Sequence, residues 1–182
     1  MEYTYKIALS YATENKEMVE KVYHHLKAEG LSVFFAPAQE CQTVLSGTNQ
    51  REIFYEIFGL KSEYVALFVS KDYLKRTVPM EEASIAFAKH SANASVIPIY
   101  LDDSELPKEL FDPQKFNYYK SNNPAQIASH LATKIKSAKD DNVTKSFGKT
   151  VQALPSTRTM NISNNTADEQ FFIQNMEGNI NL

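Results

Sequence analysis

The sequence predicts an α/β fold in which helices cover both faces of a parallel sheet. Short apolar runs alternate with longer segments of helical periodicity from Tyr5 to about Asp140, the order that right-handed βαβ units produce. The apolar runs are continuous, which is typical of strands buried on both faces. A chain of 182 residues with 43% hydrophobic content can bury one good core, so we expect one domain with appendages.

The N-terminal part contains two predicted strands separated by a helix. Residues 6–11 (KIALSY) form a compact apolar run closed by polar residues, which predicts the first strand. The helix over 14–30 places Met18, Val22 and Leu26 on one face and ends at Gly30. Residues 31–35 (LSVFF) form the second strand.

The central part continues the alternation after a long loop. A helix is predicted over 49–59, and residues 64–70 (YVALFVS) are apolar throughout, which predicts a central strand. A helix over 75–90 follows. The next strand covers 95–101, and its Pro98 favours a position near the edge of the sheet.

The C-terminal part divides into three segments. A weak strand over 116–119 and a helix over 123–139 complete the domain, which we place at 1–140. Residues 141–170 are rich in Ser, Thr and Asn and are predicted to be a flexible, disordered linker. Residues 171–182 (FFIQNMEGNINL) interleave apolar and amide side chains, which cross-β stacking favours. They are predicted to be an amyloid-like assembly motif, with a free end or a strand docked on the sheet as alternatives.

Composition excludes several classes of protein and site. The net charge is −3 with scattered Lys and Arg, so no nucleic-acid partner is expected. Cys41 is the single cysteine, which excludes an internal disulfide and a multi-cysteine metal site. His24 and His25 are adjacent and point about 100° apart on their helix, so no metal site is predicted. Without a long apolar run, we expect no membrane contact and a cytoplasmic protein.

Two carboxylates stand at the head of the alanine-rich helix over 75–90. At helical spacing, Glu82 lies about 110° from the centre of the apolar stripe and Glu81 about 150° away. Glu82 is therefore expected at the edge of the buried face, where it could face a cleft, and Glu81 is expected to be the more solvated of the two. The alternative is that both only favour the positive N-terminal end of the helix.

The order of these segments resembles the TIR (Toll/interleukin-1 receptor) domain family over about residues 3–136. KIALSYATEN resembles the first box of the family, and LKAEGLSVFF its helix-Gly-strand passage. YVALFVSKDYL resembles the central strand with its terminal Ser, and SVIPIYLD the fourth strand. The resemblance implies a flavodoxin-like domain of five parallel strands.

The resemblance also implies one of two functions. Many TIR domains cleave NAD, as a substrate and not as a cofactor, at the nicotinamide–ribose bond; the prokaryotic immune (antiphage) type is activated by oligomerisation. Others are non-catalytic interaction scaffolds. A more distant alternative is a nucleoside-processing enzyme on a related sheet. In the NAD-cleaving members the catalytic Glu follows a Trp by four residues; here Val78 occupies the Trp position and Glu82 the Glu position.

The remaining implied positions concern binding and assembly. Gly47 resembles the Gly of the loop that mediates head-to-tail self-association and helps complete the site between subunits. The chain has no Trp, and Ala36 replaces an acid often found after the second strand. Stacking on the nicotinamide or adenine would fall to Tyr11, Phe35, Tyr73 or a neighbouring subunit. The implied binding residues are Ser10, Tyr11, Ala12, Phe35, Gly47, Tyr73 and Val78.

Overall fold

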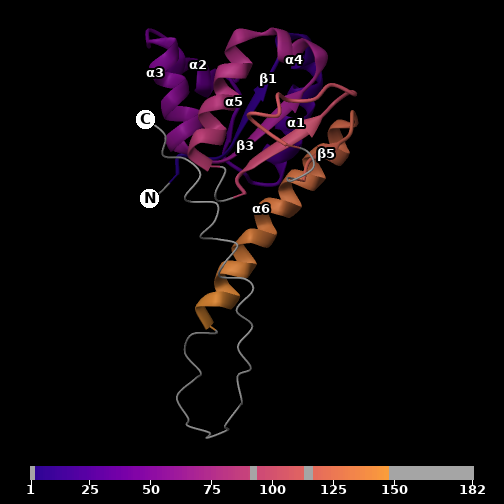
Figure 1. Cartoon of the computed structure of the whole chain (residues 1–182). Helices are drawn as coiled ribbons and strands as arrows, with labels where there is room; N and C mark the ends of the chain where they lie inside the picture. Colours follow the sequence, from indigo (N-terminus) through magenta and orange to yellow (C-terminus); the bar gives the residue numbers. More distant parts are fainter. Residues whose placement is uncertain (1–2, 91–93, 113–116, 148–182) are drawn as a thin grey trace, which may run out of the picture. The chain divides into compact units, whose positions relative to one another are not determined.

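The five strands form one parallel sheet in the computed structural model (Figure 1). The structure describes residues 3–90, 94–112 and 117–147, with side chains up to residue 138 in the last segment. The strands lie in the order β2-β1-β3-β4-β5, and every pairing is parallel. Their bounds are Tyr5–Tyr11 for β1, Val33–Phe34 for β2, Ser62–Val69 for β3, Val96–Tyr100 for β4 and Tyr119–Lys120 for β5. The predicted fold class is confirmed.

The positions of two strands in the sheet agree with the sequence. β3 is the middle strand, as its continuous apolar run predicts. β4 lies next to the edge strand β5, which pairs only with Ile99 and Tyr100. Pro98 therefore lies beyond the part of β4 that β5 covers, where a missing N–H costs least.

Helices form at each of the four predicted segments. α1 is closed at Gly30, which has a φ of +78° while the N–H of Leu31 donates to the carbonyl of Leu26 at 3.2 Å, the geometry of a glycine C-cap. The bounds are Thr13–Asn15 for the 3-10 turn η1, Lys16–Ala28 for α1, Gln39–Leu45 for α2, Gln50–Phe54 for α3, Tyr55–Lys61 for the π-helix η2, Lys71–Lys75 for α4, Thr77–His90 for α5 and Pro124–Phe147 for α6.

Two short helices replace expected loops. α2 has seven residues and buries only Cys41, so it carries no apolar stripe that a periodicity argument could detect. α4 has five residues and is capped by Ser70, whose hydroxyl accepts the N–H of Tyr73 at 3.2 Å. The predicted helix over 49–59 also changes type, since its second half is η2.

The two faces of the sheet are covered by different helices. Side chains of successive strand residues point to opposite faces. Ile7 and Leu9 of β1 pack with the apolar residues of α1 and α6. Ala8, between them, packs with residues of α2, α3, η2, α4 and α5. The same alternation assigns the next even residue, Ser10, to the face that α5 covers.

The chain beyond the domain is described only in part. Residues 1–142 form one compact unit, and α6 extends to Phe147 into the predicted linker. The rest of that linker and the predicted motif at 171–182 lie outside the described residues. None of the described helices is long and apolar enough to cross a membrane.

Candidate active site

A buried carboxyl lies where β1 ends and α5 begins. Ser10 is the penultimate residue of β1, and its hydroxyl lies 2.6 Å from Oε2 of Glu82 on α5. Glu82 is only 8% exposed, and Ser10 is fully buried. Glu82 therefore lies deeper than the edge position that the helical spacing predicts, because β1 and α4 enclose this end of α5.

Tyr73 of α4 completes the group. Its Oη lies 2.7 Å from Oγ of Ser10 and donates to the backbone carbonyl of Pro79 at 2.9 Å. The ring is fully buried. Ser70 fixes the start of α4, because its hydroxyl also donates to Oδ1 of Asn15 at 2.8 Å. The sequence gives no signal for the Pro79 carbonyl, since a backbone group has no residue type to recognise.

The electrostatics of the group favour neutral side chains. Burial raises the pKa of Glu82 to about 8, against the opposing effect of the Ser10 hydrogen bond. Burial, and then the Glu82 carboxyl, raise the pKa of Tyr73 well above its usual value. Burial, then Glu82 and Glu20, likewise raise the pKa of Tyr11. Glu82 is therefore mainly protonated at neutral pH in this closed arrangement.

Two aromatic residues expected to stack on a ligand lie on the opposite face of the sheet. Phe35 is 1% exposed and stacks between Tyr11 and Tyr23, with ring centroids 5.5 and 4.9 Å away. Tyr73, the third stacking candidate, is enclosed as described above. Tyr11 is only partly buried, so it is the most accessible residue of the three.

The other expected binding residues lie in three different parts of the domain. Ala12 is fully buried after β1, and Val78 is partly buried in the first turn of α5. Gly47 lies in the exposed connection between α2 and α3 with a φ of +76°, a conformation that favours glycine. Ala36, at the position of the replaced acid, is partly buried.

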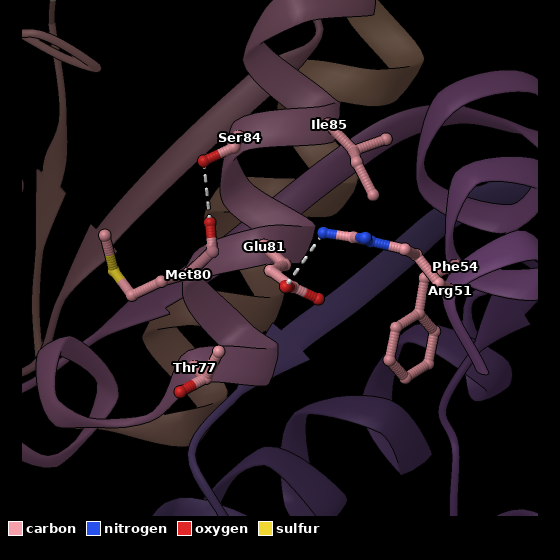
Figure 2. A pocket seen from close by; sticks show the side chains of 7 residues that line it. All are labelled: Arg51, Phe54, Thr77, Met80, Glu81, Ser84 and Ile85. Carbon is pink, nitrogen blue, oxygen red and sulfur yellow. Dashed lines mark hydrogen bonds and ion pairs between the residues drawn. The ribbon is translucent and has the colours of Figure 1, made fainter.

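Glu81 faces a different surface from its neighbour. Its side chain is 40% exposed and pairs with Arg51 of α3, with Oε1 and Nη2 3.6 Å apart, as Figure 2 shows. This confirms that Glu81 is the more solvated of the two. The pair borders a groove of about 360 Å³ between α3 and α5, whose other lining residues are Phe54, Thr77, Met80, Ser84 and Ile85. Four grooves found among the described residues all lack Glu82.

The remaining reactive side chains offer little chemistry. Cys41 is a free, fully buried thiol, and burial raises its pKa, so the nucleophilic thiolate is disfavoured. His24 and His25 are both exposed on α1. Within the described segments, no three His, Cys, Asp or Glu side chains are grouped to hold a metal ion.

Comparison with known proteins identifies the family. The family model described as the TIR domain matches residues 7–133, which is more than half of the chain. The chain belongs to the TIR domain family. The fold is also similar to the crystal structure of the TIR domain of the Toll-related receptor TRR-2 from Hydra magnipapillata, with a TM-score of 0.58 over 73% of this chain and 99% of that chain, at 18% identity.

A curated relative of this TIR domain is the 3′ cyclic ADP-D-ribose synthase AaTIR from Aquimarina amphilecti. The two sequences are 33% identical over 136 residues. The match covers 74% of this chain and 41% of the relative, so the chain corresponds to less than half of that protein.

Proposed function

We propose that this TIR domain cleaves NAD at the nicotinamide–ribose bond, with Glu82 as the catalytic residue. The observation that carries the proposal is a carboxyl placed at the carboxyl end of β1, the edge at which open α/β sheets bind ligands. The relative's name supports the substrate, because cyclic ADP-ribose is the part of NAD that remains when nicotinamide leaves.

The reaction suits a single carboxylate. When the C–N glycosidic bond of NAD breaks, the electron pair leaves with the ring nitrogen, and nicotinamide departs as a neutral molecule without a general acid. Positive charge develops on the ribose, and an ionised Glu82 beside it would stabilise that charge. Water, or a hydroxyl of the same molecule, then forms the new C–O bond and gives up its proton. The first route yields linear ADP-ribose and the second a cyclic product.

Catalysis requires Glu82 to change state. The side chain must lose its proton and become accessible to the sugar, and a raised pKa near 8 makes it a stronger base once both conditions are met. A cationic nicotinamide ring bound nearby would favour the ionised carboxyl by direct attraction. Tyr11, at the same end of the sheet, is the expected binding residue best placed to contact a ligand ring.

We further propose that self-association controls this activity in a cytoplasmic, prokaryotic immune (antiphage) setting. The exposed connection that contains Gly47 is suited to head-to-tail contact because it is not covered by the domain's own core. Residues 171–182 would add a second contact through their amide-rich composition. Both contacts would raise the local concentration of TIR domains.

The test is nicotinamide release from NAD by the purified protein at high concentration. Glu82→Gln keeps the shape and removes the charge, so release should fall by at least about 100-fold, the scale of losing a key electrostatic group. Glu81→Gln is the matched control, one residue away on the same helix, and should retain activity. Equal activity in Glu82→Gln and the parent would reject the assignment.

A non-catalytic scaffold is the second candidate. It is favoured by the closed surroundings of Glu82, the absence of Trp and the Ala36 position. A scaffold would self-associate in sedimentation without releasing nicotinamide at any protein concentration. Deleting residues 171–182 should reduce the sedimenting size in either case, and an unchanged size would remove the tail from the proposal.

A further inference from the structure

Four polar groups form a continuous hydrogen-bond chain inside the domain. It runs from Oε2 of Glu82 to Oγ of Ser10 at 2.6 Å, from there to Oη of Tyr73 at 2.7 Å, and on to the carbonyl of Pro79 at 2.9 Å. The chain joins β1, α4 and the first turn of α5. Its start and its end both lie on α5, only three residues apart.

The number of protons in this chain depends on the charge of Glu82. The Pro79 carbonyl can only accept, and each hydroxyl can donate one proton. With Glu82 protonated, the carboxyl donates to Ser10, Ser10 to Tyr73, and Tyr73 to Pro79. Each of the three contacts is then a hydrogen bond with its own proton.

Ionisation leaves two protons for the same three contacts. Ser10 now donates to the carboxylate, since a charged acceptor forms the stronger hydrogen bond. Tyr73 can donate either to Ser10 or to Pro79, so one of these two contacts loses its hydrogen. The link between α4 and the first turn of α5 is therefore weaker when Glu82 is charged.

We propose that Ser10 and Tyr73 are positioning residues that hold Glu82 closed at rest, that Tyr73 favours its protonated form and Ser10 its ionised form, and that loss of the proton loosens the first turn of α5. The proposal rests on the proposed function only in giving Glu82 a catalytic role; the hydrogen-bond chain itself does not depend on it. In this proposal Ser10 and Tyr73 act on the carboxyl of Glu82 and not on a ligand.

The groups that surround Glu82 leave few competing explanations for its titration. Tyr11 on β1 and Tyr73 on α4 are the titratable side chains whose own pKa values respond to Glu82. Glu81, its neighbour on α5, points to Arg51. No basic side chain in the described part of the chain is among the influences on the pKa of Glu82.

Two single-oxygen deletions give opposite predictions. Ser10→Ala removes neutral hydrogen bonds from the protonated state and the stronger, charge-assisted bond from the ionised state, so the pKa of Glu82 should rise by less than about one pH unit. Tyr73→Phe removes two contacts from the protonated state and one from the ionised state, so that pKa should fall by about one pH unit. A purely structural role for the two hydroxyls would lower stability without shifting the titration in opposite directions.

The readout does not require activity. The free energy of unfolding is measured by urea denaturation at a series of pH values, and the pH at which its decline levels off gives the folded-state pKa of Glu82. Tyr100→Phe is the control. Tyr100 is buried and its Oη accepts the N–H of Leu106 at 3.3 Å, so it takes no part in the hydrogen-bond chain to Glu82. The titration of Glu82 in this variant should match that of the parent. Shifts in the same direction, or none, would overturn the proposal.

The two proposals can fail separately. Opposite shifts in a protein that never releases nicotinamide would support the hydrogen-bond chain and reject the enzyme. Nicotinamide release that needs Glu82 but has the parent's pH profile in both Ser10→Ala and Tyr73→Phe would support the enzymatic function and reject the proposed hydrogen-bond chain.

Discussion

Replacing Glu82 by Gln should stabilise the protein at alkaline pH. Gln has the size of Glu, and its amide can donate to Ser10 as the protonated carboxyl does, but it carries no charge at any pH. The folded state holds the proton of Glu82 up to about pH 8, whereas the unfolded chain loses it near its ordinary value. Above pH 8 the folded parent therefore holds a buried charge that lowers its free energy of unfolding, and the variant does not.

The size of the effect follows from the two pKa values. Between the ordinary value of 4.5 and about 8, the folded parent binds one more proton than the unfolded chain, so its stability falls by about 1.4 kcal/mol per pH unit. The stability gained by Glu82→Gln should be about 1 kcal/mol at pH 5 and about 4 to 5 kcal/mol at pH 9, where it levels off.

Urea denaturation of the parent and the variant at pH 5, 7 and 9 measures this difference. Glu81→Gln serves as the control, because Glu81 is partly exposed and paired with Arg51 at the surface; its effect should stay within about 0.5 kcal/mol and change little with pH. A Glu82→Gln difference that is the same at pH 5 and pH 9 would show that the carboxyl ionises freely in the folded state, and the closed arrangement would be refuted.

Three further outcomes are expected. Ser70→Ala removes the cap of α4 and a buried hydrogen bond, so the free energy of unfolding should fall by about 1 to 2 kcal/mol in urea denaturation; a neutral effect would contradict the capping role. Burial lowers the pKa of His90, so the unfolded chain binds more protons below about pH 6.5 and stability falls as the pH falls. His90→Gln keeps a donor for the Phe58 carbonyl without titrating, and thermal melts at pH 7 and pH 5 should show a smaller loss than in the parent. Cys41 should react with a thiol reagent far more slowly in the native protein than in denaturant; equal rates would mean that the thiol is exposed.

The strands and long helices could be predicted from the sequence because their signals are local. The continuous apolar run of β3 and the apolar stripe of α1 reflect burial that each element needs by itself. Short elements lack such a signal: α2 buries one residue, and α4 depends on the single cap at Ser70. β5 falls at Tyr119–Lys120, shifted from the predicted 116–119, since two paired residues carry no usable pattern.

The candidate site could be predicted only as a region. Helical spacing correctly separates Glu82 from the more solvated Glu81, because both belong to one regular element. It could not predict that Ser10 and Tyr73 meet Glu82, since they are 72 and 9 residues away along the chain and only the fold brings them together. Strand alternation also assigns Tyr11 to the opposite face from Ser10, which separates two residues that are adjacent in the sequence.

The C-terminal end of α5 is held in place by contacts that do not involve Glu82. His90 is buried there, and its Nε2 donates to the carbonyl of Phe58 in η2 at 3.0 Å. Gly59 beside it lets the two helices approach closely, since an added Cβ would meet Ile85 at 3.3 Å. Eight residues, or about 12 Å of helix axis, separate His90 from Glu82. With its far end fixed, α5 can expose Glu82 by pivoting rather than sliding, and a pivot of about 15° would carry the carboxyl roughly 3 Å.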